Sequence, residues 1–196
     1  MTGDDLRAAA TAVQPLFDRV PDGGAAVPLL ATDVTGVAHH ITSCLTWYAA
    51  DLVAGPVEVS AFDLVRRPDV ELVEMCRQLR AAAEVLARVV DAADPADRGA
   101  HDWGLADASG FAGMGCAEML LHTWDVADGR GLTWAPPAAL ASRVLGRLFP
   151  WAPTDADPWA ALLWSTGRRE LPGREPVTSW RWHCAPLSEW DGTQPT

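Results

Sequence analysis

The chain has 196 residues and a formal net charge of −11. Such a molecule would repel a phosphate backbone or an anionic membrane surface over most of its area, so nucleic acid and membranes are not expected as partners. Its length and its balance of hydrophobic and charged residues suit one globular domain over residues 1–196. The N-terminus MTGDDLRAAA has carboxylates where a secretory signal is basic, so we expect a cytoplasmic protein.

Apolar residues at helical spacing cover most of the chain. Asp33 is placed to cap the second of the predicted helices, and either Asp107 or Ser109 can cap the fourth. Pro136 and Pro137 suit the first turn of the fifth. Six helices are expected, over residues 4–19, 33–54, 69–93, 108–128, 137–149 and 157–166.

Strand signals are confined to residues 177–184 (VTSWRWHC), which alternate between apolar and polar positions but have no partner strand. Residues 94–107 are polar and Gly-rich and are expected to form a loop. The predicted fold class is therefore all-α. Four long helices predict an antiparallel four-helix bundle with additional C-terminal helices, in a core of about residues 4–170 followed by a short irregular tail over 171–196.

The four cysteines lie far apart and form no CxxC pair, which argues against a disulfide framework or a thiolate zinc site. Most of them fall among apolar residues, where a free cysteine behaves as a small buried hydrophobe. We expect this structural role for Cys44, Cys76, Cys116 and Cys184.

A helical wheel of residues 108–128 places Glu118 and His122 within an apolar arc. The arc is made of Phe111, Met114, Met119, Leu121 and Val126. Because Glu118 and His122 are four positions apart, their side chains project from one face, one turn apart. A carboxylate and an imidazole that face a core must be paired, hydrogen-bonded or bound to a metal. The pair is either a buried Glu–His hydrogen bond, two ligands of one ion, or, if the helix is rotated, two side chains that both reach solvent.

A third donor for such an ion lies in the predicted helix 33–54. His40 falls at the edge of its apolar arc, next to Val37, whereas His39 points to the opposite, polar side. His40 can therefore turn inward. Two imidazoles and one carboxylate from two long helices form a His2Glu set that leaves one coordination position free.

Three segments follow one another along the chain: VTGVAHHI, AEMLLHTWDVADGRGL and LLWSTGR. Together they resemble the DinB-like bundle proteins and, among them, the mycothiol-dependent maleylpyruvate isomerase-type enzymes. The family pattern is a histidine after apolar positions of the second helix, then Glu-x-x-x-His-x-x-Asp, then a late Gly-Arg. The resemblance covers roughly residues 5–170.

The resemblance implies that His40, Glu118 and His122 bind a divalent metal, usually zinc. It also implies a low-molecular-weight thiol such as mycothiol as co-substrate, and a small electrophile as the second substrate. A divalent ion keeps a bound thiol as the thiolate, which is the attacking species. We therefore expect a metal-dependent thiol S-transferase or isomerase-type enzyme.

Further residues are candidates for roles around this site. Asp125, three positions after His122, is placed either to orient that ligand or hold an Arg, or simply to be solvated. Arg168 is a candidate for binding a carboxylate of thiol or substrate, with an ordinary surface ion pair as the alternative. His101 and Trp103 lie in the 94–107 loop and are candidates for the rim of the pocket.

Two other functions fit the same residues. One is a metal-dependent hydrolase or lyase that uses bound water as the nucleophile. The other is a non-catalytic bundle that binds a small molecule or an oligomeric partner, and a homodimer is compatible with the sequence. Metal content and thiol dependence of turnover distinguish the three.

Overall fold

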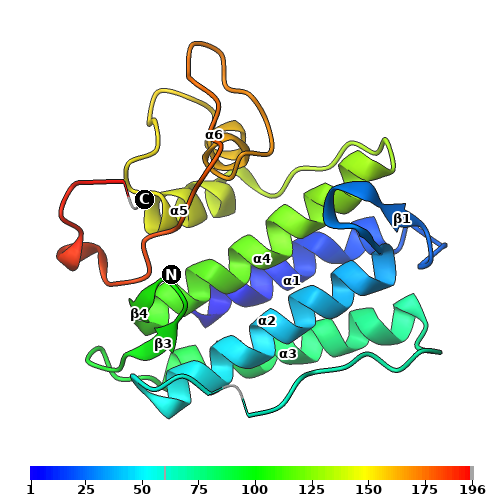
Figure 1. Ribbon diagram of the computed structural model, residues 1–196, viewed down its shortest axis with the longest axis horizontal. Coiled ribbons are helices and arrows are strands. Elements are labelled where there is room, and N and C mark those ends of the chain that lie inside the picture. Colours follow the sequence, from blue (N-terminus) through cyan, green and yellow to red (C-terminus); the bar gives the residue numbers. More distant parts are fainter. Residues whose placement is uncertain (60, 195–196) are drawn as a thin grey trace.

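The computed structural model describes residues 1–59 and 61–194 (Figure 1). Its helices are α1 (Gly3–Phe17), α2 (Val34–Ala54), α3 (Leu72–Ala92), α4 (Ala108–Gly129), α5 (Ala138–Leu148) and α6 (Pro158–Ser165), with 3₁₀ turns at Pro28–Leu30 and Leu187–Glu189. Two antiparallel strand pairs join β1 (Ala26–Val27) to β2 (Thr32–Asp33) and β3 (Gly99–His101) to β4 (Gly104–Ala106). The mostly helical structure confirms the predicted all-α class.

Local capping sets where the long helices begin. The Asp33 carboxylate accepts a hydrogen bond from the backbone N–H of Gly36, and the Asp107 carboxylate accepts one from Gly110 at 2.8 Å, so Asp107 rather than Ser109 caps α4. A capping box formed by Glu71 and its third neighbour starts α3 later than the predicted residue 69. These contacts are local, which is why the sequence predicts the helix positions closely.

Two local predictions are wrong. Residues 94–107 are not all loop, because the three-residue strands β3 and β4 form a hairpin there. Residues 177–184 form no strand, although their alternation corresponds to real burial: Trp182 and Cys184 are buried while Arg181 between them is exposed. The pattern reflects an extended segment with one face against the protein and does not require a partner strand.

The four long helices lie side by side around one core (Figure 1). Helices α1 and α2 each pack against both α3 and α4. Side chains of α1, α2 and α3 meet at Gly115 of α4. A Cβ atom added to Gly115 would stand 2.8 Å from the Cδ2 atoms of Leu6 and Leu86 and 3.0 Å from that of Leu45. Glycine is needed there because three other helices approach the α4 backbone closely.

Helix α4 is buried on almost every side, since α5 covers the face that α1 and α2 leave open. Helix α6 packs on α5, and the chain after it runs back toward the start of α4 and the β3–β4 hairpin (Figure 1). Polar groups on α4 are therefore held inside the protein. Among the described residues, no helix combines the length and the apolar character needed to cross a membrane.

Candidate metal centre

Three side chains from two neighbouring helices converge between α2 and α4. Glu118 Oε2 lies 3.3 Å from His40 Nε2 and 3.1 Å from His122 Nε2. The donor atoms of all three residues lie within 4.8 Å of one another. The two imidazole rings meet edge to face, with centroids 4.7 Å apart. The structure thus brings together the three residues that the sequence analysis selected as ligands.

The donor set could hold a metal ion. Glu118 Oε2 is buried and has no hydrogen-bond partner, although two imidazole nitrogens lie close to it. The three groups therefore face a common point, where either an ion or a proton between the nitrogen and oxygen atoms would partner this carboxylate oxygen. Ligand atoms of a tetrahedral zinc ion are about 3.3 Å apart, since the zinc–ligand bonds are about 2.0 Å long. The separations of 3.1 and 3.3 Å agree with that geometry.

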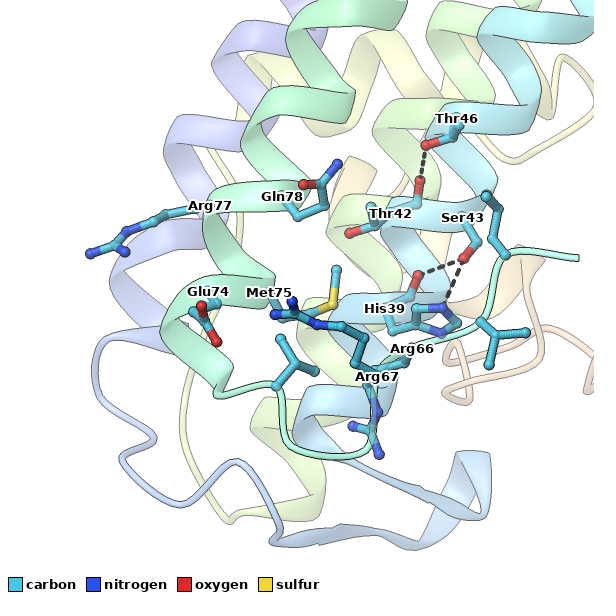
Figure 2. A pocket seen from close by; sticks show the side chains of 13 residues that line it. His39, Thr42, Ser43, Thr46, Arg66, Arg67, Glu74, Met75, Arg77 and Gln78 are labelled. Atoms are coloured by element: carbon cyan, nitrogen blue, oxygen red, sulfur yellow. Dashed lines mark hydrogen bonds between the residues drawn. The ribbon is translucent and has the colours of Figure 1, made fainter.

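His39 lies on the other side of α2. It lines a separate cavity of about 600 Å³ between α2, the start of α3 and the segment that carries Arg66 and Arg67. Figure 2 shows His39 there, beside Ser43. Adjacent histidines thus face different surroundings, and only His40 reaches Glu118.

Two residues behind His122 fix the direction of its ring. His122 Nδ1 is 2.8 Å from Asp125 Oδ2, and Arg168 donates from Nε and Nη2 to the two Asp125 oxygens, both at 2.9 Å. A carboxylate on Nδ1 keeps a proton on that nitrogen, so an ion that binds Nε2 displaces only the other proton of the ring. This geometry gives Asp125 and Arg168 a positioning role. Contact of Arg168 with a substrate carboxylate stays a prediction.

The sequence analysis missed two residues of the site, Cys44 and Tyr48. Cys44 Sγ lies 3.6 Å from His40 Nε2, and the buried Tyr48 hydroxyl donates to Glu118 Oε1 at 3.2 Å. His40, Cys44 and Tyr48 are spaced four apart, so they form one stripe along α2. The spacing of four residues is visible in the sequence and could have indicated that Cys44 and Tyr48 lie near His40. Cys44 is thus not only a buried hydrophobe, because it lies next to a candidate ligand.

A cavity of about 510 Å³ lies beside the three convergent side chains. Cys44 and Tyr48 line it and also contact His40 and Glu118, which places the cavity next to the donors. Its other lining residues are Trp47, Asp51, Glu58, Val59, Phe62, Asp63, Ala100, His101 and Asp102. We call this cavity the α2–β3 pocket.

No protein-family model, curated protein or solved structure matches this chain. The resemblance to the DinB-like proteins therefore rests on the sequence motifs alone and remains a prediction.

The charges around Glu118 and His122 stabilise one another. Burial favours the neutral form of both, but the contacts with His122 and His40 lower the pKa of Glu118 below its usual value. Hydrogen bonds and charges of Asp125 and Glu118 outweigh the burial of His122 and raise its pKa to about 9. Glu118 is therefore a carboxylate at neutral pH, the form that binds a cation.

Asp125→Asn should weaken metal binding without removing a ligand. The asparagine side chain can turn only its NH2 group or its uncharged carbonyl oxygen toward His122 Nδ1. The imidazole ring therefore loses the charged carboxylate that orients it. We expect zinc affinity to fall roughly 10- to 100-fold, as for other second partners of metal-bound histidines. Competition with a chromophoric chelator measures it. Affinity equal to that of the unmodified protein would show that Asp125 does not orient His122.

Asp51 gives a prediction for pH dependence. Burial, followed by the charges of Asp102 and Glu58, raises the pKa of the Asp51 carboxyl to about 6. A carboxyl whose pKa is higher in the folded state costs stability once it ionises, so the cost grows between about pH 4 and pH 6. Asp51→Asn should therefore add about 1 kcal/mol to the free energy of unfolding above pH 7, after discounting for solvent screening, and nothing near pH 4.

Urea unfolding at several pH values tests the effect of Asp51→Asn. Asp69→Asn is the control, since it removes the same charge from an exposed position outside the pocket. An equal gain in both variants would assign the effect to net charge rather than to the pocket.

Proposed function

We propose that this chain is a metal-dependent thiol S-transferase or isomerase-type enzyme, in which His40, Glu118 and His122 hold one divalent ion, with zinc the best fit. The observation that carries this is the convergence of two imidazoles and one buried carboxylate on a common point, where Glu118 Oε2 has no hydrogen-bond partner. The proposal includes a DinB-like antiparallel four-helix bundle formed by α1 to α4. The mutual packing of these four helices supports it.

The donor set suits a reactive site better than a purely structural one. Three protein ligands leave the fourth position of a tetrahedral ion open, whereas structural zinc sites are closed by four protein ligands. His40 has a side chain that is 52% exposed, while those of Glu118 and His122 are 10% and 14% exposed. The site is therefore reached by small molecules from the His40 side.

A divalent ion in this place would supply a thiol held as its thiolate at neutral pH. The chain's own residues prepare the place for it. Asp125 and Arg168 direct His122, and Tyr48 holds the second oxygen of Glu118. The thiolate sulfur forms a bond to the electrophilic carbon while a leaving group departs as an anion, such as chloride, and the product is an S-conjugate. With a conjugated carbonyl compound the C=C π bond breaks instead and the α carbon takes a proton from water; loss of that proton and of the thiolate after rotation about the C–C bond returns an isomer.

Thiol dependence tests the proposal. Protein purified without chelator is incubated with neutral electrophiles, such as chlorodinitrobenzene and cyclohexenone, and with mycothiol, cysteine or glutathione. We expect conjugation above the uncatalysed rate with at least one thiol, loss of activity on dialysis against a chelator and recovery with zinc. His39→Ala is the matched control and should keep the activity that His40→Ala loses.

Two results would contradict the proposal. Turnover without thiol would point to a hydrolase or lyase that uses bound water. Activity unchanged by removal of the metal, or retained in full by Glu118→Ala, would show that the convergent side chains are not the reaction centre.

A further inference from the structure

The α2–β3 pocket contains a histidine that the proposed function does not use. His101, in β3, accepts a hydrogen bond at Nδ1 from the backbone N–H of Trp103, at 3.1 Å. Cys184 Sγ lies 3.7 Å from the same nitrogen. A ring nitrogen that accepts a backbone N–H carries no proton itself. The neutral ring of His101 therefore has its proton on Nε2.

The ring stays neutral near pH 7. Burial lowers the pKa of His101 by more than the charges of Asp102 and Glu118 raise it. The hydrogen bonds of the described residues occupy Nδ1 and give Nε2 no acceptor. His101 thus lines the pocket with a ring whose tautomer is fixed by the fold and whose Nε2–H has no acceptor among the described residues.

The donor stands close to the candidate metal centre. The Tyr48 and His101 rings are 5.8 Å apart between centroids, and the Tyr48 hydroxyl is 3.2 Å from Glu118 Oε1. One aromatic ring therefore separates His101 from the convergent ligands. A molecule in the pocket can touch His101 with one atom and present another to a nucleophile at the metal.

The remaining walls restrict the charge of such a molecule. Four carboxylates line the pocket: Asp51, Glu58, Asp63 and Asp102. Within the described part of the chain no arginine forms a salt bridge with any of them, although arginines pair with carboxylates at many other places. The opposite wall is apolar, with Trp47 and Phe62 at 5.0 Å between ring centroids. Such a pocket disfavours a carboxylate or phosphate ligand through like-charge repulsion.

We propose that His101 donates its Nε2–H to the carbonyl oxygen of an uncharged electrophile, an α,β-unsaturated carbonyl compound, bound in the α2–β3 pocket. The substrate class rests on the proposed function, but the binding site does not. In the reaction, the thiolate sulfur bonds to the carbon β to the carbonyl, and the C=C electron pair shifts toward the oxygen. The hydrogen bond from His101 stabilises the charge that develops there, and the α carbon then takes a proton from water.

The tautomer is the first point to measure. A long-range proton–nitrogen NMR spectrum of the histidine rings, with His101 assigned by comparison with His101→Gln, shows which nitrogen carries the proton. We expect Nε2–H at pH 7.5 in the metal-free full-length protein. An Nδ1–H tautomer would overturn the proposal, whatever the metal centre does.

Ligand binding is the second point. Succinimide and succinate are similar in size, and they represent an uncharged carbonyl compound and a dianion. We expect succinimide to shift the His101 ring signals in metal-free protein, and succinate to bind at least tenfold more weakly. The double variant Asp51→Asn, Asp102→Asn should narrow that difference. Equal binding of the two probes, or no change at His101 with succinimide, would overturn the proposal.

Kinetics then separate this inference from the proposed function. With cyclohexenone and thiol, His101→Phe should lower kcat about 100-fold, the usual effect of losing one donor to a developing oxyanion. His101→Gln keeps an N–H donor and should recover part of that loss, while the affinity for zinc stays unchanged in both. Normal kcat in His101→Phe would refute the role of His101. If no thiol-dependent turnover occurs at all, the proposed function fails and the two NMR results still decide the binding site.

Discussion

Glu118→Ala should lose zinc affinity by a factor of roughly 100 to 1,000. The binding free energy of structural zinc sites is about 10–16 kcal/mol over four ligands, or about 2.5–4 kcal/mol for each ligand. The loss of one ligand therefore corresponds to this range of affinity. Glu118 is the central one of the three candidate ligands, with one oxygen within 3.3 Å of both imidazole nitrogens. His122→Ala and His40→Ala should show losses of the same order.

Stability gives a readout of zinc binding that needs no substrate. A ligand that binds only the folded protein adds about 4 kcal/mol to the free energy of unfolding at a free concentration 1,000 times its Kd. Zinc should therefore raise the Tm of the unmodified protein by several degrees and leave the Tm of Glu118→Ala almost unchanged. Elemental analysis of protein purified without chelator measures the same difference as metal content.

His39→Ala is the control that the chain itself offers. It removes an imidazole from the neighbouring position of the same helix, on the side that lines the other cavity (Figure 2). It should bind zinc as the unmodified protein does. A response to zinc that Glu118→Ala, His122→Ala and His40→Ala all retain would show that the ion binds elsewhere, and both the metal centre and the enzyme proposal would fall.

The helices and the convergent ligands were accessible from the sequence because their signals are local and periodic. Asp33 and Asp107 each cap the helix that follows them by accepting a hydrogen bond from the backbone N–H three residues later. Glu118 and His122 share a face because they are one turn apart. The wheel of residues 33–54 also separates His40 from His39. Each of these statements needs the geometry of only one helix.

Contacts between distant segments were not accessible in this way. Arg168 pairs with Asp125 across 43 positions, and nothing local distinguishes that pairing from a surface charge. The β3–β4 hairpin was missed because strands of three residues are too short to show alternation. The fixed tautomer of His101 depends on that hairpin and on the C-terminal segment, so it appears only once both are placed.

The largest loss of stability is expected from a substitution in α5 that releases the C-terminal segment. Arg147 of α5 has a side chain that is only 5% exposed. It donates to the Asp107 carboxylate and the Ser109 hydroxyl at the start of α4, and to the backbone carbonyls of His183 and Cys184. One guanidinium therefore joins α5, the start of α4 and the segment that contacts His101.

Arg147→Met should lower the free energy of unfolding by about 3–5 kcal/mol. Methionine keeps the apolar stem of the side chain, but the Asp107 carboxylate and the two backbone carbonyls lose the guanidinium that donates to them. Urea unfolding measures the loss, and limited proteolysis after residue 170 should become faster. Arg174→Met is the matched control: it also removes an arginine–carboxylate pair, with Asp155, but both side chains are exposed, so its cost should stay below about 1 kcal/mol. If the two variants were equally stable, Arg147 would not be the anchor of this segment, and the packing of Trp182 on His101 would have to be held by other contacts.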